Sequence, residues 1–304
     1  MQDATICHKW IKIKIMNSRI ILFLLVSFGF SWAVATGLYF LPENKSALKG
    51  GLTFLYMCGP AIGALICAWR FNAGNRIAAL GLRLRFNRWL FLAYLIGIIL
   101  VMGSTALAFL FSDISAVQPV IGYSAILKES GVDVGNMLTT MPYGNLILIG
   151  QFLILAPLLN IPFMLSEELG WRGWLWHEMR PKGFWYVTLW TGLFWGIWHA
   201  PVIAMGHNYP DMPVFGPILF TAFCLLYSPI FSYIREKSGS VWGACILHGA
   251  TNGAAALGLA IQSSIDLPWR GVVGIGGFVI LCGFTLFVFY KKSVEKRALN
   301  PAAS

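Results

Sequence analysis

The sequence predicts an all-α fold, a polytopic membrane helix bundle of about eight transmembrane helices with both termini in the cytoplasm. Of its 304 residues, 58% are hydrophobic and only 11% are charged, and the mean hydropathy is +0.71. This composition is typical of a multi-pass membrane protein and unlike that of a soluble domain. The net charge of +10 therefore does not indicate a nucleic acid partner, because membrane proteins retain Lys and Arg in their cytoplasmic loops.

The predicted spans follow from length, since a helix needs about 20 apolar residues to cross a hydrocarbon core of roughly 30 Å. Eight stretches meet this requirement: 20–41, 52–69, 89–112, 146–178, 186–205, 214–234, 241–261 and 271–290. The fourth is too long for one straight perpendicular span. It contains Pro157 and Pro162, which predict a kink or tilt, or an interfacial first segment.

The basic residues between the spans predict the orientation. With the N-terminus in the cytoplasm, only four of the 22 Lys and Arg residues fall on the outer side: Lys45, Lys49, Lys128 and Arg270. This asymmetry fits the positive-inside rule and favours an integral protein of the cell membrane. The predicted organisation is a basic cytoplasmic segment 1–19, a transmembrane bundle 20–290 whose functional core is at about 146–261, and a basic cytoplasmic tail 291–304.

The N-terminus has a competing interpretation. Basic residues, an apolar run and the sequence Ala33-Val34-Ala35 also resemble a secretory signal peptide with its cleavage site. The apolar run continues to Leu41, longer than the hydrophobic region of such a peptide, which favours an uncleaved first span. Translation from Met16 would give a more compact start.

Ionisable and amide side chains inside three predicted spans are the candidate functional residues. Glu167, Glu168 and Arg172 lie in the fourth span, His199 in the fifth, and His248 with Asn252 in the seventh. A charge at the centre of a membrane helix costs about 2.5–3.5 kcal/mol, so such residues are functional candidates. A lone His or Asn would be interpreted as a residue that hydrogen-bonds between helices and stabilises their packing. Two adjacent acids with two histidines exceed what packing requires and are the residue types of a hydrolytic site.

Helical spacing indicates which of these side chains cooperate. Glu168 and Arg172, four residues apart, are predicted to pair along their own helix. Glu167 points about 100° away and is left for another role. Glycine pairs 192/196 and 249/253 would let the two histidine-bearing helices approach their neighbours closely, although such patterns are common in membrane packing.

The three segments "EELGWR" (167–172), "WGIWH" (195–199) and "HGATN" (248–252) resemble the ordered motifs of the CAAX-processing and bacteriocin-processing (CPBP) intramembrane proteases, related to type II CAAX prenyl endopeptidases. The motifs of that family are EExxxR, FxxxH and HxxxN or HxxxD, and Trp195 stands here in place of the Phe. The resemblance covers less than a third of the chain.

The resemblance implies an intramembrane endopeptidase. Glu167 and His199 would activate a water molecule, His248 and Asn252 would stabilise the oxyanion, and Glu168 with Arg172 would support the motif. No cofactor is certain. The set Glu167, His199 and His248 would equally suit one divalent metal such as Zn²⁺, so both the glutamate-type and the metal-dependent mechanism stay open.

The expected partners are membrane lipids and a hydrophobic peptide, lipidated protein or membrane protein as substrate, of the CAAX or the peptide-precursor type. Seven of the 13 tryptophans fall between 171 and 198; an interfacial aromatic belt explains them, or Trp195 and Trp198 line a hydrophobic substrate site. Two other functions remain: a non-catalytic immunity or scaffold protein, and a proton-coupled transporter, which the absence of repeat symmetry disfavours.

Overall fold

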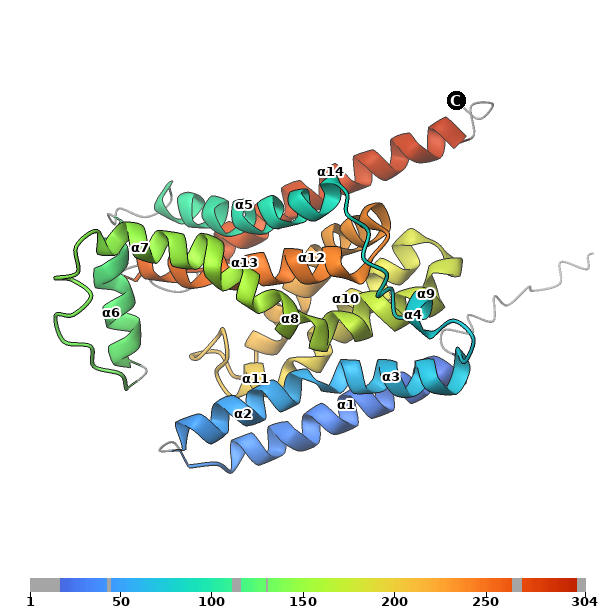
Figure 1. Ribbon diagram of the computed structural model, residues 1–304, viewed down its shortest axis with the longest axis horizontal. Helices are drawn as coiled ribbons and strands as arrows, with labels where there is room; N and C mark the ends of the chain where they lie inside the picture. The colour runs from blue at the N-terminus through green and yellow to red at the C-terminus, as the bar shows by residue number, and fades with distance from the viewer. Residues whose placement is uncertain (1–16, 43–44, 111–115, 130, 264–269, 300–304) are drawn as a thin grey trace, which may run out of the picture.

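The computed structural model describes residues 17–42, 45–110, 116–129, 131–263 and 270–299. Helices account for its regular structure, as predicted (Figure 1). Most of the predicted segment 1–19, with Met16, and the last residues of the predicted tail lie outside the described residues. In order along the chain, the helices are α1 (Ser18–Tyr39), α2 (Ser46–Met57), α3 (Gly59–Phe71), α4 (Arg76–Ala79), α5 (Arg88–Leu110), α6 (Pro119–Glu129), α7 (Gly144–Gly150), η1 (Gln151–Leu155), α8 (Ala156–Glu168), η2 (Leu169–Trp174), α9 (Leu175–Met179), η3 (Arg180–Lys182), α10 (Phe184–Trp198), α11 (Ala200–Ala204), α12 (Gly216–Ser238), α13 (Val241–Ile261) and α14 (Ile275–Leu299).

Seven helical stretches within the described residues are long and apolar enough to cross a membrane: 18–39, 47–71, 88–110, 144–182, 216–238, 241–261 and 275–299. The chain is therefore an integral membrane protein. The predicted fifth span, 186–205, is not among these stretches, because it forms the 15-residue α10 and the five-residue α11, which meet at His199. Pro201 lacks a backbone N–H and restricts the residue before it, which explains the break.

The long fourth span is kinked, as its prolines predict. It runs over 39 residues as successive segments of different pitch: η1 and η2 are π-helical and flank the α-helical α8. Pro157 lies in the first turn of α8 and Pro162 lies inside the helix. Pro162 has no backbone N–H, so the helix lacks one hydrogen bond at this position. Figure 1 shows α7 and α8 running obliquely across the bundle toward α9.

Basic side chains gather at one end of the bundle, which we call the basic end. Arg19 at the start of α1 stacks on Phe71 at the end of α3, with the guanidinium carbon 5.1 Å from the ring centroid, and lies 3.7 Å from Glu178 of α9. At the same end, Lys237 of α12 pairs with Glu295 of α14. The helix α14 continues to Leu299, so residues 291–299 of the predicted tail extend this last span.

Close helix contacts position the site, and the glycines make them possible. A Cβ added to Gly196 would lie 2.6 Å from Thr221 Cα of α12, and one added to Gly253 would lie 2.5 Å from Pro157 Cδ of α8. Both predicted glycine pairs therefore sit at tight helix contacts: Gly192 and Gly196 join α10 to α12, and Gly249 and Gly253 join α13 to α8. The second contact brings α13 against the helix that carries the two glutamates.

Candidate active site

The two glutamates end α8 at the point where the helix widens into the π-helical η2. Glu167 is 4% exposed, and Glu168 and Arg172 are fully buried. Both carboxylate oxygens of Glu168 accept hydrogen bonds from Arg172 Nη1, at 3.1 and 3.2 Å. The predicted Glu168–Arg172 pair is therefore present, and π-helical turns of this kind are frequent at functional sites.

His248 reaches this pair from α13. Its Nδ1 lies 2.9 Å from Glu168 Oε1, and the side chain is mostly buried. Gly249 follows His248 directly; a Cβ there would lie 3.0 Å from the Pro157 carbonyl oxygen. A larger residue would hold the helices apart, so the glycine contact makes the interaction of His248 with Glu168 possible.

Trp195 connects α10 to Glu167 and to Arg172. Its indole N–H donates to Glu167 Oε2 at 2.9 Å, and its ring lies 4.4 Å from the guanidinium carbon of Arg172. Phe231 of α12 lies on the same guanidinium at 4.1 Å. Arg172 Nε and Nη2 are buried without a hydrogen-bond partner among the described residues, so the two aromatic faces supply their stabilisation through cation–π interactions.

His199 lies next to this cluster, at the break between α10 and α11. Its Nδ1 is 2.8 Å from the Trp195 carbonyl oxygen, and its ring packs edge-on against Trp195 and Trp198, at centroid distances of 5.8 and 4.6 Å. The indole of Trp195 also packs edge-on against His248 at 5.5 Å. One tryptophan ring thus touches both histidines and Glu167.

Asn252 is the member of the predicted set that stands apart. It lies one turn beyond His248 on α13, is exposed, and donates from Nδ2 to the Met164 sulfur at 3.4 Å. A thioether is a weak acceptor, so little is lost if the amide turns to another partner.

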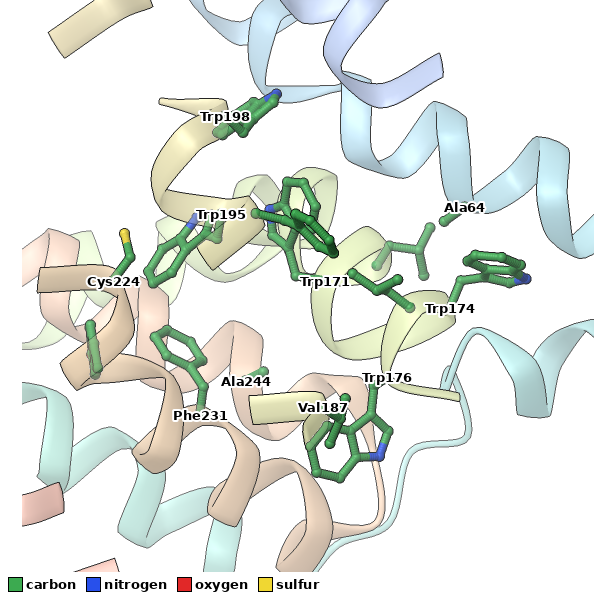
Figure 2. Packing of buried hydrophobic residues seen from close by; sticks show 14 of the residues in the cluster. Ala64, Trp171, Trp174, Trp176, Val187, Trp195, Trp198, Cys224, Phe231 and Ala244 are labelled. Atoms are coloured by element: carbon green, nitrogen blue, oxygen red, sulfur yellow. The ribbon is translucent and has the colours of Figure 1, made fainter. Parts of the chain in front are cut away.

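The predicted substrate residues Trp195 and Trp198 are both buried, and Figure 2 shows Trp195 among the labelled residues of the core cluster, with Trp171 and Phe231. Of the seven tryptophans between 171 and 198, five are buried: Trp171, Trp174, Trp176, Trp195 and Trp198. These five form part of the protein core rather than an interfacial belt. Contact with a substrate stays a prediction for Trp195 and Trp198.

Tyr56 of α2 is a neighbour of the site that the sequence motifs did not indicate. Its hydroxyl donates to the Trp198 carbonyl oxygen at 2.5 Å, and Trp32 Nε1 of α1 donates to the same oxygen at 3.1 Å. These bonds fix the end of α10 directly before His199. A buried tyrosine in a helix outside the motifs carries no spacing signal that could have identified it.

The hydrogen bonds define which nitrogen of each histidine carries a proton. A carboxylate that is paired with Arg172 only accepts, so His248 Nδ1 donates to Glu168. His199 Nδ1 likewise donates to a carbonyl oxygen. In their neutral forms both imidazoles therefore present Nε2 as an acceptor, and His248 donates from Nε2 only as an imidazolium.

The proposed metal ligands do not converge. Among the residues that the structure describes, no group of three or more His, Cys, Asp and Glu side chains is arranged to hold a metal ion. The Trp195 ring contacts both His199 and His248, and its N–H occupies one oxygen of Glu167. In this arrangement Glu167, His199 and His248 do not fit one shared metal.

Comparison with known families places these motifs in one domain. Residues 145–254 match the type II CAAX prenyl endopeptidase Rce1-like family. The chain carries an Rce1-like domain. This domain contains every predicted site residue from Glu167 to Asn252 and runs from α7 to α13, which confirms the resemblance of the three motifs. Among curated proteins, no match was found.

Proposed function

We propose that this chain is an intramembrane endopeptidase that hydrolyses a peptide bond of a lipidated or membrane-embedded substrate. The Rce1-like domain at residues 145–254 supports protein or peptide substrates. The observation that carries the proposal is the joining of the three motifs: Trp195 donates to Glu167 and His248 donates to Glu168, each at 2.9 Å. Side chains of α10 and α13 are thereby fixed around the two adjacent carboxylates of α8.

Glu167 is the proposed general base. Its Oε2 is held by Trp195, while Oε1 has no hydrogen-bond partner among the described residues and is not one of the fully enclosed polar atoms. A water molecule at Oε1 would give up a proton to it as the water oxygen attacks the peptide carbonyl carbon. When the tetrahedral intermediate collapses, the carbon–nitrogen bond breaks and Glu167 returns the proton to the departing amine.

His199 is proposed to help hold this water through Nε2, its free acceptor. His248 and Asn252 are proposed to stabilise the oxyanion of the intermediate. For His248 this role requires a second N–H on the ring, at Nε2, while Nδ1 keeps its hydrogen bond to Glu168. Asn252 would turn its amide from Met164 toward the oxyanion.

Glu168 and Arg172 are proposed to act as positioning residues. Glu168 orients the His248 ring, and Arg172 neutralises Glu168. The proposed mechanism uses no metal, because the candidate ligands do not converge on one point.

The test is cleavage by purified, detergent-solubilised protein of matched peptides, one carrying a C-terminal prenylated CAAX sequence, one unprenylated, and one membrane-spanning. Wild type is compared with Glu167→Gln and His248→Ala, each with and without a strong chelator. We expect the wild type to cleave at least one peptide, both variants to lose about a hundredfold or more in rate, and the chelator to have no effect.

Loss of wild-type cleavage with the chelator, restored by Zn²⁺, would contradict the metal-free mechanism while keeping the protease. If wild type and Glu167→Gln give the same result in the cleavage assay and the same phenotype in the host, the scaffold function would be supported and the protease function contradicted.

A further inference from the structure

A cavity of about 280 Å³ lies at the basic end of the bundle, outside the candidate active site. It is formed by α4 and the segment that leads to α5, by α9 with the following turn, and by the end of α12; Figure 1 shows α4 and α9 next to one another at this end. Its lining residues are Ala78, Arg85, Trp176, His177, Arg180, Arg235, Glu236 and Gly239.

The cavity has an excess of positive charge. Arg85, Arg180 and Arg235 line it, and none of them forms a salt bridge with any residue that the structure describes. Glu236 is the one acid among the lining residues, and both of its oxygens accept hydrogen bonds from Lys292, at 3.3 and 3.0 Å. The three arginines are therefore left without a counterion from the lining.

The backbone of the protein is shaped to hold these arginines. Gly81 has φ of +66°, which favours glycine, and a Cβ there would lie 2.5 Å from Arg235 Nη2, so a larger residue would displace the guanidinium. Gly239 has φ of +69°, and a Cβ there would lie 3.3 Å from Arg85 Cδ. At both positions the positive φ favours glycine, and the glycine also lets an arginine side chain pack closely against the backbone.

Arg235 is the innermost of the three, at 8% exposed. Its Nε donates to the Arg172 carbonyl oxygen at 2.7 Å, and within the described part of the chain its two Nη groups have no hydrogen-bond partner. Desolvating a guanidinium without a partner is unfavourable. The free Nη donors of Arg235, with Arg85 and Arg180 at the same cavity, form a set of forked donors that matches the oxygens of a phosphate group.

We propose that this cavity binds a phosphate-bearing anion, with the headgroup of an anionic membrane phospholipid as its occupant. The lipid is favoured over free phosphate because the lining residues stand at the ends of membrane-spanning helices, where the headgroups of a bilayer lie. Arg235 would also link the bound anion to the candidate active site. Its Nε donates to the backbone carbonyl oxygen of Arg172, and Arg172 pairs with Glu168.

The test measures binding and does not depend on proteolysis. Full-length protein in an uncharged detergent is titrated with phosphatidylglycerol, with diacylglycerol of the same chains, and with inorganic phosphate at matched ionic strength. Binding is read from the thermal unfolding midpoint and from bound lipid in native mass spectrometry. The variants are Arg85→Gln/Arg180→Gln and, as control, Arg76→Gln/Arg83→Gln, which removes the same charge from exposed arginines of the neighbouring segment that do not line the cavity.

We expect phosphatidylglycerol to bind and diacylglycerol not to bind, and the Arg85/Arg180 variant to bind phosphatidylglycerol about tenfold or more weakly while the control variant binds like the wild type. Inorganic phosphate with the same dependence on the variants would support the phosphate site and make free phosphate its occupant. Equal loss in both variants, or equal binding of phosphatidylglycerol and diacylglycerol, would overturn the proposal, because the effect would then come from general surface charge or from the acyl chains.

Discussion

Glu167 and Glu168 are neighbours in sequence, yet their surroundings assign them different tasks. Glu168 is fully buried and its carboxylate is saturated by Arg172 and His248. Glu167 binds a single indole N–H through one oxygen. A carboxylate that is completely engaged suits a structural role, whereas a carboxylate with a free oxygen suits proton transfer.

These two environments predict that a Glu→Gln substitution affects the stability of the fold differently at the two positions. Glu167→Gln keeps an oxygen that can accept from Trp195, so we expect an unfolding midpoint close to that of the wild type with cleavage lost. Glu168→Gln removes the counter-charge of the fully buried Arg172, which should destabilise the fold by about 3–5 kcal/mol. Thermal unfolding of both purified variants in detergent measures the difference. Similar midpoints for the two variants would refute the division of tasks.

At the scale of elements, the site depends on how closely α13 approaches α8. Gly249 and Gly253 form the contact surface of α13 against Pro157, and His248 lies directly beside it. The sequence patterns predicted the close approach and the Glu168–Arg172 pair, since both follow from helical spacing. They did not predict the π-helical η2, the bond from Trp195 to Glu167 or the contribution of Tyr56, because these depend on tertiary packing that spacing does not encode.

The break within the predicted fifth span has a related cause. Hydropathy counts residues 186–205 as one stretch, but Pro201 and the turn at His199 divide it into α10 and α11. Hydropathy windows average over such a break. The same break leaves the Trp198 carbonyl oxygen free to accept from Tyr56 and Trp32, which places His199 beside the glutamates.

Substitution of Gly253 tests this dependence on close packing. In Gly253→Ala the added methyl group would collide with Pro157, so α13 should shift and move His248 away from Glu168. We expect a destabilisation of about 1–3 kcal/mol and a clear loss of cleavage. The control is Gly283→Ala in α14, where an added Cβ would meet nothing within 4 Å. Wild-type stability and rate in Gly253→Ala would show that the site does not need this contact.

At the scale of the whole molecule, the path of the chain indicates that a segment shorter than a typical membrane helix can still lead from one end of the bundle toward the other. The chain is at the basic end at α9, where Glu178 meets Arg19, and again at the end of α12, where Asn87 donates to the Ser238 carbonyl oxygen. Between them, Tyr209 donates to the Val273 carbonyl oxygen before α14 begins. The segment α10–α11 thus leads away from the basic end although it is shorter than a typical membrane helix.

This path predicts that residues 183–204 cross the bundle and that both termini face the cytoplasm. Green fluorescent protein fused after Lys182 or after the C-terminus should fluoresce, because it folds in the cytoplasm, whereas alkaline phosphatase fused after Asp211 should be active, because it requires the outer side. A matched pair of both reporters at each position serves as the control for expression. The predicted distribution of charge, with 18 of the 22 Lys and Arg residues on the inner side of the membrane, gives the physical reason for this orientation. If Lys182 and Asp211 report the same side, α10 and α11 re-enter the bundle without crossing it, and His199 reaches the site from a re-entrant segment whose two ends lie on one side of the membrane.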